Sequence, residues 1–336
     1  MRHYVGLDHC RWLRPSAAIG RRMRHVLTGD ALRSLPSVDL QHLLTEAYCW
    51  DHSAPNSGTS HVGLAAAMDH TVPFAVSNQP ALQHLEELRR TAFVRYPQQA
   101  SMMVSPLQGL WLYWLVLLTG ARRVLELGSF MGYSTVWLAE ALKANTNSYH
   151  ANTSTHHDHT APYLMACEMN PEYVKHLKHT VQNLALEPLV SIRQGAALES
   201  LEAIRSTHQP FDLIFLDANK REYVQYYEFI LEHGLLSSPQ GLMVVDNTLF
   251  HDTIHPQYPP VRQVLDQAAS LAGADGSAQG SIATNQTRKP SVTARHLYRF
   301  NQHVAADPRT EQFIMPLFDG LTLIRHQMRA LGPTER

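Results

Sequence analysis

Two short apolar runs are each followed directly by oxygen-bearing side chains, and this pairing restricts the fold more than any other feature of the chain. The run LIFL precedes Asp217, and the run LMVV precedes Asp246 and Asn247. Such runs, bounded by turn signals, predict buried strands. In a parallel sheet, groups just beyond the carboxyl ends of neighbouring strands meet at one edge. We therefore expect these three side chains to converge, with Lys220 beside them.

The expected site contains oxygen donors without Cys or His. Such a set favours a hard divalent cation, Mg²⁺ first, with Mn²⁺ or Ca²⁺ as alternatives. Lys220, three residues after Asp217, would stand beside that ion. Two simpler possibilities stay open: a solvated lysine at a helix start, and a side-chain turn at Asp246-Asn247 after a strand.

Strand and helix patterns alternate along the chain, which predicts an α/β fold built on a parallel sheet. A final hairpin around Asp319-Gly320 would add an antiparallel strand. The expected helices are 39–47, 81–94, 106–118, 134–143, 171–185, 198–207, 223–233 and 298–306. Besides the two runs above, the expected strands are 123–127, 163–167, 190–194, 313–317 and 321–325.

Composition excludes several classes of protein. The net charge of −1 argues against a nucleic-acid partner. Three cysteines lie far apart, which fits a reducing compartment and argues against a disulfide framework. The longest apolar run, 107–121, is shorter than the roughly 20 residues that a membrane span needs. We therefore expect a cytoplasmic protein that does not bind membranes.

A loop of small residues, Glu126 to Ser134 (ELGSFMGYS), follows the first expected strand. Small residues between a strand and a helix let a ligand approach free backbone amides, although a simple tight turn explains them equally well. Phe130 occupies the second glycine position of the dinucleotide fingerprint, which disfavours NAD and FAD and leaves an adenosine ligand without phosphates. Glu168, which ends the next strand, can accept both ribose hydroxyls.

Together these motifs resemble the S-adenosylmethionine-dependent, cation-dependent O-methyltransferases of the caffeoyl-CoA and catechol type. The resemblance covers residues 37–325. It implies a Rossmann-like class I methyltransferase fold, with helices on both faces of a seven-stranded, mostly parallel sheet that ends in an antiparallel hairpin, and a homodimer. The matching segments are MMVS (102–105), ELGSFMGYS (126–134), FDLIFLDANK (211–220), VDNTL (245–249), DPR (307–309) and LFDGLTLIR (317–325).

The resemblance also implies roles for individual residues. Lys220 and Asp217 match the catalytic residues, and Asp217, Asp246 and Asn247 match the metal ligands. Two positions depart from the pattern of the family: Asn219 replaces an aspartate, and His251 replaces an asparagine. His251 is either a substrate contact or a surface residue. The residues that match S-adenosylmethionine contacts are Val104, Glu126, Gly128, Ser129, Ser134, Glu168 and Ala197.

On this basis the chain divides into an Arg-rich leader, 1–36, and one methyltransferase domain, 37–330. Within the domain, 37–100 would form lid helices and 101–330 the catalytic sheet. Polar or small residues dominate 53–79, 145–162 and 272–291, which we expect to be surface insertions. Removing 145–162 restores the usual spacing of about 20 residues between Gly128 and Glu168. The arginines of the leader make mitochondrial import an alternative location.

The expected reaction is methyl transfer to one hydroxyl of a vicinal aromatic diol, such as a catechol, a caffeoyl group or a related small phenolic. A phenol keeps its proton near neutrality because its pKa is about 10. A divalent cation chelated by both oxygens would stabilise the phenolate. Lys220, its pKa lowered by that cation, would accept the proton. The alternatives are a methyltransferase with a non-catechol acceptor, a non-catalytic binding protein and a dehydrogenase.

Overall fold

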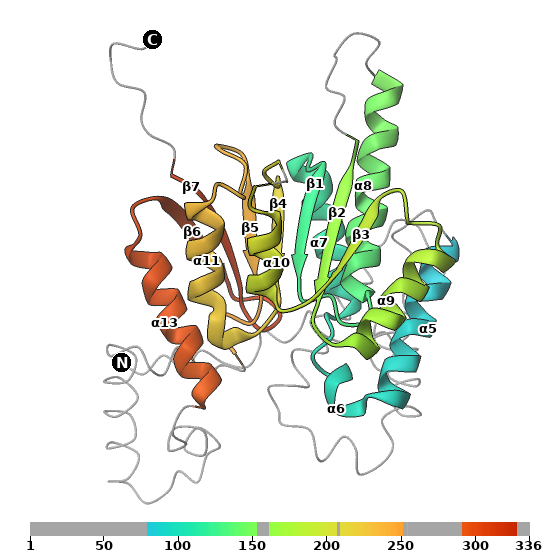
Figure 1. Cartoon of the computed structure of the whole chain (residues 1–336), viewed down its shortest axis with the longest axis horizontal. Helices are drawn as coiled ribbons and strands as arrows, with labels where there is room; N and C mark the ends of the chain where they lie inside the picture. The colour runs from blue at the N-terminus through green and yellow to red at the C-terminus, as the bar shows by residue number, and fades with distance from the viewer. Residues whose placement is uncertain (1–78, 153–160, 207–208, 251–253, 255–290, 328–336) are drawn as a thin grey trace, which may run out of the picture.

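The computed structural model describes residues 79–152, 161–206, 209–250, 254 and 291–327 (Figure 1). Several of the expectations above fall wholly or mainly on other residues: the leader, most of the lid segment 37–100 with its helix at 39–47, the insertions at 53–79 and 272–291, and His251. None of the helices in the described ranges is both long and apolar enough to cross a membrane.

A seven-stranded sheet forms the centre of the fold, in the order β3-β2-β1-β4-β5-β7-β6. The first five strands run parallel, and β7 is antiparallel to both β5 and β6. This confirms the predicted mostly parallel sheet with a C-terminal antiparallel hairpin. The strands are β1 Arg123–Leu127, β2 Tyr163–Glu168, β3 Val190–Gln194, β4 Leu213–Leu216, β5 Leu242–Val245, β6 Thr310–Met315 and β7 Leu321–His326.

Helices cover both faces of this sheet. In Figure 1, α10, α11 and α13 lie on the near side and α7 and α8 behind it. The strands supply both cores by alternation: Val124 packs into one and Leu125 into the other. The helices are α5 Gln79–Arg95, α6 Pro97–Ala100, α7 Pro106–Thr119, α8 Tyr133–Asn152, α9 Pro171–Asn183, α10 Ala197–Ile204, α11 Tyr223–Glu232 and α13 Val292–Ala306, with a 3₁₀ turn, η2, at Lys220–Glu222.

Helix α8 corrects one expectation, because it continues to Asn152 through residues predicted to start a loop. The side-chain amide of Asn145 donates to the carbonyls of Val116 and Ala121, both at 3.0 Å. The hydroxyl of Thr146 donates to the carbonyl of Leu142 at 2.9 Å. Extending a helix that has already formed costs far less than nucleating one, so polar residues with such partners can prolong it.

Helix α13 also starts earlier than expected, at Val292 rather than Tyr298. Ser291 caps it by accepting a hydrogen bond from the backbone of Ala294 at 3.0 Å. Strand β6 likewise begins at Thr310 rather than Phe313. Both differences lie at element ends, where local pattern is least informative.

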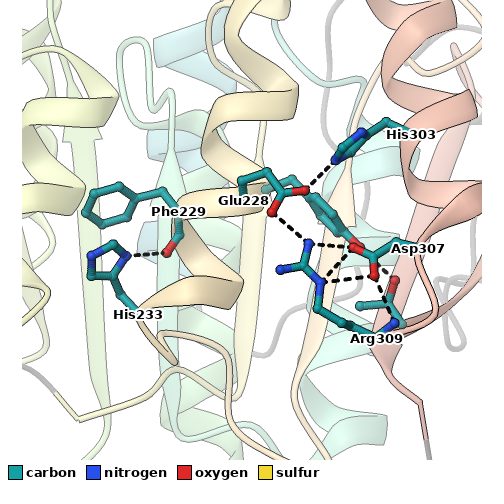
Figure 2. A network of polar contacts seen from close by, with 8 residues as sticks. Glu228, Phe229, His233, His303, Asp307 and Arg309 are labelled. Atoms are coloured by element: carbon teal, nitrogen blue, oxygen red, sulfur yellow. Dashed lines mark hydrogen bonds and ion pairs between the residues drawn. The ribbon is translucent and has the colours of Figure 1, made fainter.

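An ion-pair network fastens the C-terminal elements to the rest of the fold (Figure 2). Glu228 on α11 accepts from Arg309 at 2.7 Å and also contacts His303 on α13. Asp307 accepts from Arg309 at 2.6 Å and from the hydroxyl of Tyr227 at 2.8 Å. This network holds the turn into β6, and the hairpin that follows pairs through β7 with β5.

Helices α7 and α8 pack closely at Gly109. A Cβ atom at this position would lie 2.2 Å from Nε1 of Trp137, whose side chain is fully buried. No side chain at residue 109 fits unless the two helices separate. Gly109 therefore sets the depth of α7 against the core.

We expect Gly109→Ala to destabilise the protein by about 1–3 kcal/mol through overpacking. Urea unfolding measures this loss. Replacing Trp137 with Leu in the same chain removes the obstructing ring, so the two substitutions should be strongly non-additive. Additive effects would show that Gly109 and Trp137 are not coupled.

Candidate active site at the carboxyl edge of the sheet

The strand order reverses between β1 and β4, because β2 and β3 extend the sheet on one side of β1 whereas β4 and β5 extend it on the other. Polar groups gather at the carboxyl edge beside this point. Leu216 at the end of β4 pairs with Val245 at the end of β5. The backbone amide of Asp246 donates to the carbonyl of Leu216 at 3.0 Å, and that of Asp217 to the carbonyl of Leu127 at 2.8 Å. The structure thus places the two aspartates in equivalent positions on adjacent strands.

Lys220 and Asp217 form a short ion pair at this edge. Nζ of Lys220 lies 2.5 Å from Oδ1 of Asp217, and the two side chains are 20% and 13% exposed. The ammonium also lies 5.9 Å from the ring centre of Tyr223, which is buried beneath it. Burial alone would lower the pKa of Lys220, but Asp217 and two further carboxylates outweigh it and raise the pKa. In the metal-free protein Lys220 is therefore an ammonium.

Asp246 is held at both carboxylate oxygens. Oδ2 accepts from the side-chain amide of Gln108 at 2.7 Å, and Oδ1 accepts from the backbone amide of Asn247 at 2.7 Å. Burial, reinforced by the charge of Asp217, raises the pKa of Asp246 to about 7. The site thus contains carboxylates that are crowded and short of compensating positive charge.

Asn247 adopts a left-handed backbone conformation, with φ of 61°. Asparagine tolerates this region better than most residues. Its side-chain nitrogen donates to Oδ2 of Asp319 at 3.0 Å, which leaves the amide oxygen for another partner. In the described part of the chain, no group of three His, Cys, Asp or Glu side chains is arranged to hold a metal ion. The set at this edge instead combines the carboxylates of Asp217 and Asp246 with an amide.

Two residues of this edge, Gln108 and Asp319, are missed by sequence reasoning. Gln108 stands three residues after Ser105, a spacing that indicates a helix start and nothing more. Asp319 precedes a glycine, so it is explained by the hairpin turn. Each contacts a site residue that is distant in the sequence, and local sequence patterns do not reveal such contacts.

Gly128 brings the loop after β1 against the same edge. Its φ is +93°, and a Cβ atom there would lie 2.2 Å from the carbonyl oxygen of Asp217. The backbone amides of Gly128 and Ser129 donate to the carbonyl of Cys167, at 3.0 and 3.1 Å. Conformation and space both require glycine at this position.

Glu168, at the end of β2, is oriented by two backbone amides. Phe130 donates to Oε2 at 2.9 Å and Asn170 to Oε1 at 2.8 Å. Phe130 has a φ of 48°, and its ring packs edge-on against Tyr173 with centroids 4.5 Å apart. Phe130, which replaces a glycine of the dinucleotide pattern, thus holds the carboxylate of Glu168 in place through its backbone amide.

Glu126 is completely buried at the end of β1. Its Oε2 accepts from the hydroxyl of Thr135 at 2.5 Å, whereas Oε1 has no hydrogen-bond partner among the described residues. Burial raises the pKa of Glu126 to about 7. A buried acceptor without a donor marks a place where a ligand can complete the hydrogen bonding.

This raised pKa predicts a pH-dependent stability. Folded Glu126 keeps its proton to a higher pH than the unfolded chain does, so stability falls as pH rises from about 4.5 to about 7. Relative to Glu126→Gln, the wild-type ligand-free protein should lose up to about 3 kcal/mol of unfolding free energy over this range. Urea unfolding at several pH values tests this; superimposable pH profiles for the two proteins would contradict it.

The remaining predicted cofactor contacts lie before α7, in the loop after β1, in α8 and in α10. Val104 is buried before α7, and its carbonyl accepts from Arg89 at 3.1 Å. Ser129 and Ser134 are buried in the loop and at the start of α8. Ala197 is the first residue of α10.

The strand order and the loop after β1 define a class I methyltransferase fold. The chain belongs to the O-methyltransferase family, whose pattern matches residues 75–327. The predicted enzyme class, an S-adenosylmethionine-dependent O-methyltransferase, is confirmed.

Solved structures show the same fold. The chain is similar to the SAH-bound methyltransferase PaMTH1 of Podospora anserina, with a TM-score of 0.55, 24% identity and coverage of 81% of this chain and 97% of that one. It is also similar to the O-methyltransferase from Bacillus cereus in complex with SAH, with a TM-score of 0.53, 22% identity and coverage of 78% and 96%.

Sequence relatives lie within the predicted branch of the family. O-methyltransferase ankF of Aspergillus thermomutatus is 29% identical over 228 residues, 68% of this chain and 80% of that protein. A catechol O-methyltransferase of Niastella koreensis is 33% identical over 150 residues, 44% of this chain and 59% of that protein. Caffeoyl-CoA O-methyltransferase 2 of Populus trichocarpa is 25% identical, over 67% of this chain and 74% of that protein.

Proposed function

We propose that this enzyme methylates one hydroxyl of a vicinal aromatic diol on a small phenolic molecule, with a divalent cation held by Asp217, Asp246 and Asn247. One observation carries the proposal: the Lys220–Asp217 ion pair stands beside a buried aspartate at the same sheet edge. A proton acceptor and a set of oxygen ligands therefore lie next to the loop that contains Gly128.

The loop residues fit S-adenosylmethionine. Glu126 offers a buried oxygen without a donor, which suits the amino group at the methionine end. Glu168 is fixed by two amides and keeps lone pairs for the two ribose hydroxyls. We propose that Val104, Gly128, Ser129, Ser134 and Ala197 complete this pocket.

The acidic residues fit a divalent cation, most simply Mg²⁺. Asp246 is buried, and burial together with repulsion from Asp217 raises its pKa. Neutral oxygen donation by Asn247 completes a set typical of hard cations. When bound, S-adenosylmethionine supplies the methyl group, and the cation supplies positive charge that favours the ionised form of a phenolic hydroxyl.

Lys220 is placed to take the proton that leaves the acceptor hydroxyl. Carboxylates hold it as an ammonium in the metal-free protein, because their charge raises its pKa. The same carboxylates, once shared with a dication, stabilise the ammonium less, so Lys220 can release its proton and act as a base. Tyr223 supports this arrangement, since its hydroxyl donates toward the carbonyls of Leu216 and Asp246, at 3.4 and 3.3 Å.

The catechol and caffeoyl-CoA enzymes among the relatives support a vicinal diol as acceptor. Asn219, which departs from the family pattern, caps η2 by accepting from the backbone of Arg221 at 3.3 Å. That role is local, so the change leaves the chemistry of the site intact. A methyltransferase with a non-catechol acceptor remains the second candidate.

A homodimer is also proposed, by resemblance to the family. Apolar side chains on the described surface are compatible with a partner: Trp114 and Leu118 of α7 are 47% and 78% exposed. They lie four residues apart on one face of the helix. Light scattering of the full chain measures the oligomeric state.

Calorimetry with S-adenosylmethionine tests the cofactor assignment. We expect binding to wild type, much weaker binding to Glu168→Ala, and no binding of NAD(H) to either protein. Equally tight binding of S-adenosylmethionine to wild type and Glu168→Ala, or binding of NAD(H), would contradict the proposed cofactor site.

A further inference from the structure

A buried glutamine of α7 is hydrogen-bonded to the aspartate at the end of β5. Nε2 of Gln108 donates to Oδ2 of Asp246 at 2.7 Å, across 138 residues of sequence. Gln108 is 5% exposed and Asp246 is 4% exposed. Two buried polar groups that satisfy each other over this distance in the chain fix the relative position of a helix and a strand end.

The glutamine is placed by the way α7 begins. Ser105 caps the helix by accepting from the backbone amide of Gln108 at 3.2 Å. In the Ser-x-x-Gln pattern the glutamine side chain commonly turns back to the cap residue. Here its side-chain nitrogen donates to Asp246 instead.

The helix that carries this glutamine cannot shift easily. Gly109, which follows Gln108 in this helix, packs against the ring of Trp137 without room for a Cβ atom. Leu110 and Leu112, in the same helix, are 2% and 0% exposed. The donor is therefore held rigidly relative to the sheet edge.

Both oxygens of Asp246 consequently receive one hydrogen bond from a neutral donor, Gln108 on one side and the backbone of Asn247 on the other. Two such bonds fix the plane of the carboxylate, and each oxygen keeps a lone pair. A lysine or arginine at residue 108 would fix it too, but would add a charge that repels a cation.

We propose that Gln108 is a positioning residue that orients Asp246 for the divalent cation and thereby sets the affinity of the site for metal. This inference rests on the proposed function, since it assumes that Asp246 binds a cation. It assigns to Gln108 no contact with the metal or with the acceptor. Its effect is exerted through the geometry of one carboxylate.

The test compares metal affinity with cofactor affinity in Gln108→Leu. Free Mn²⁺ is followed by electron paramagnetic resonance, and S-adenosylmethionine binding by calorimetry. We expect Mn²⁺ affinity to fall by about 10–100-fold, the usual effect of losing a hydrogen-bond partner of a metal ligand. Binding of S-adenosylmethionine should be unchanged. Gln108→Asn keeps the amide but places it too far from Asp246, so it should also weaken Mn²⁺ binding. This variant replaces Gln108→Leu in the test if the leucine variant fails to fold.

Gln312→Leu is the matched control, because the Oε1 atom of Gln312 is buried on β6 and makes no hydrogen bond within the described residues. It should bind Mn²⁺ like the wild type. Unchanged Mn²⁺ affinity in both Gln108 variants would overturn the inference, as would equal weakening of Mn²⁺ and S-adenosylmethionine. Failure of the wild type to bind Mn²⁺ would overturn the proposed metal site, and this inference with it.

Discussion

Replacing Lys220 with methionine is expected to slow methyl transfer by about 10²–10⁴-fold, the usual contribution of a positioned acid or base. The affinity for S-adenosylmethionine should be retained, because Lys220 contacts Asp217 and the ring of Tyr223 rather than the loop around Gly128. Single-turnover rates measured at saturating cofactor separate the chemical step from binding.

The Lys220→Arg variant tests whether Lys220 accepts a proton or contributes only its positive charge. Arginine keeps the positive charge and can pair with Asp217, but it does not give up its proton in proteins. If Lys220 acts as a base, the arginine variant should be about as slow as the methionine variant. An arginine variant with nearly wild-type turnover would show that Lys220 contributes only its charge. Thermal unfolding of both variants controls for the buried carboxylate that the methionine variant leaves unpaired.

Gly128→Ala is expected to abolish measurable cofactor binding. The new Cβ atom would lie 2.2 Å from the carbonyl oxygen of Asp217, and the backbone would have to keep a φ of +93°. Either the loop moves away from the ribose site or the end of β4 moves away from β5. Both displacements disrupt the site, so activity should be lost together with S-adenosylmethionine affinity in calorimetry.

Gly234→Ala provides the control for backbone strain. Gly234 also has a positive φ, of +60°, but no atom lies within 4 Å of its added Cβ. This variant should lose about 1 kcal/mol of stability and bind the cofactor normally. Equal loss of binding in both variants, or normal binding by Gly128→Ala, would contradict the proposed role of the close approach to Asp217.

The central strands could be predicted because their sequences identify them without tertiary information. LIFL and LMVV are almost completely buried, and apolar runs of this length between turn signals are typical of strands inside a parallel sheet. Convergence of Asp217 and Asp246 followed from parallel pairing alone. The left-handed φ of Phe130 could not be predicted from its loop alone, because its ring packs against Tyr173 of α9.

The partners of the site could not be predicted, because they depend on long-range packing. Gln108 reaches Asp246 across 138 residues, and Asp319 reaches Asn247 across 72. Each also has a local role, as part of a helix start or a hairpin turn. The extension of α8 was missed for a similar reason, since Asn145 is stabilised by carbonyls at the end of α7 and just after it.

The most direct test of the proposed chemistry is methyl transfer to a panel of vicinal diols, each paired with its own monomethyl ether, before and after Mg²⁺ is restored to exhaustively chelated enzyme. The panel comprises catechol, caffeate, caffeoyl-CoA and flavonoids with adjacent hydroxyls. If Asp217, Asp246 and Asn247 bind the cation, at least one diol should be methylated when Mg²⁺ is present, and little of it should be methylated after chelation. The monomethyl ethers should be methylated little in either condition. Undiminished transfer after chelation, or equal transfer to a diol and its monomethyl ether, would contradict the proposed chemistry.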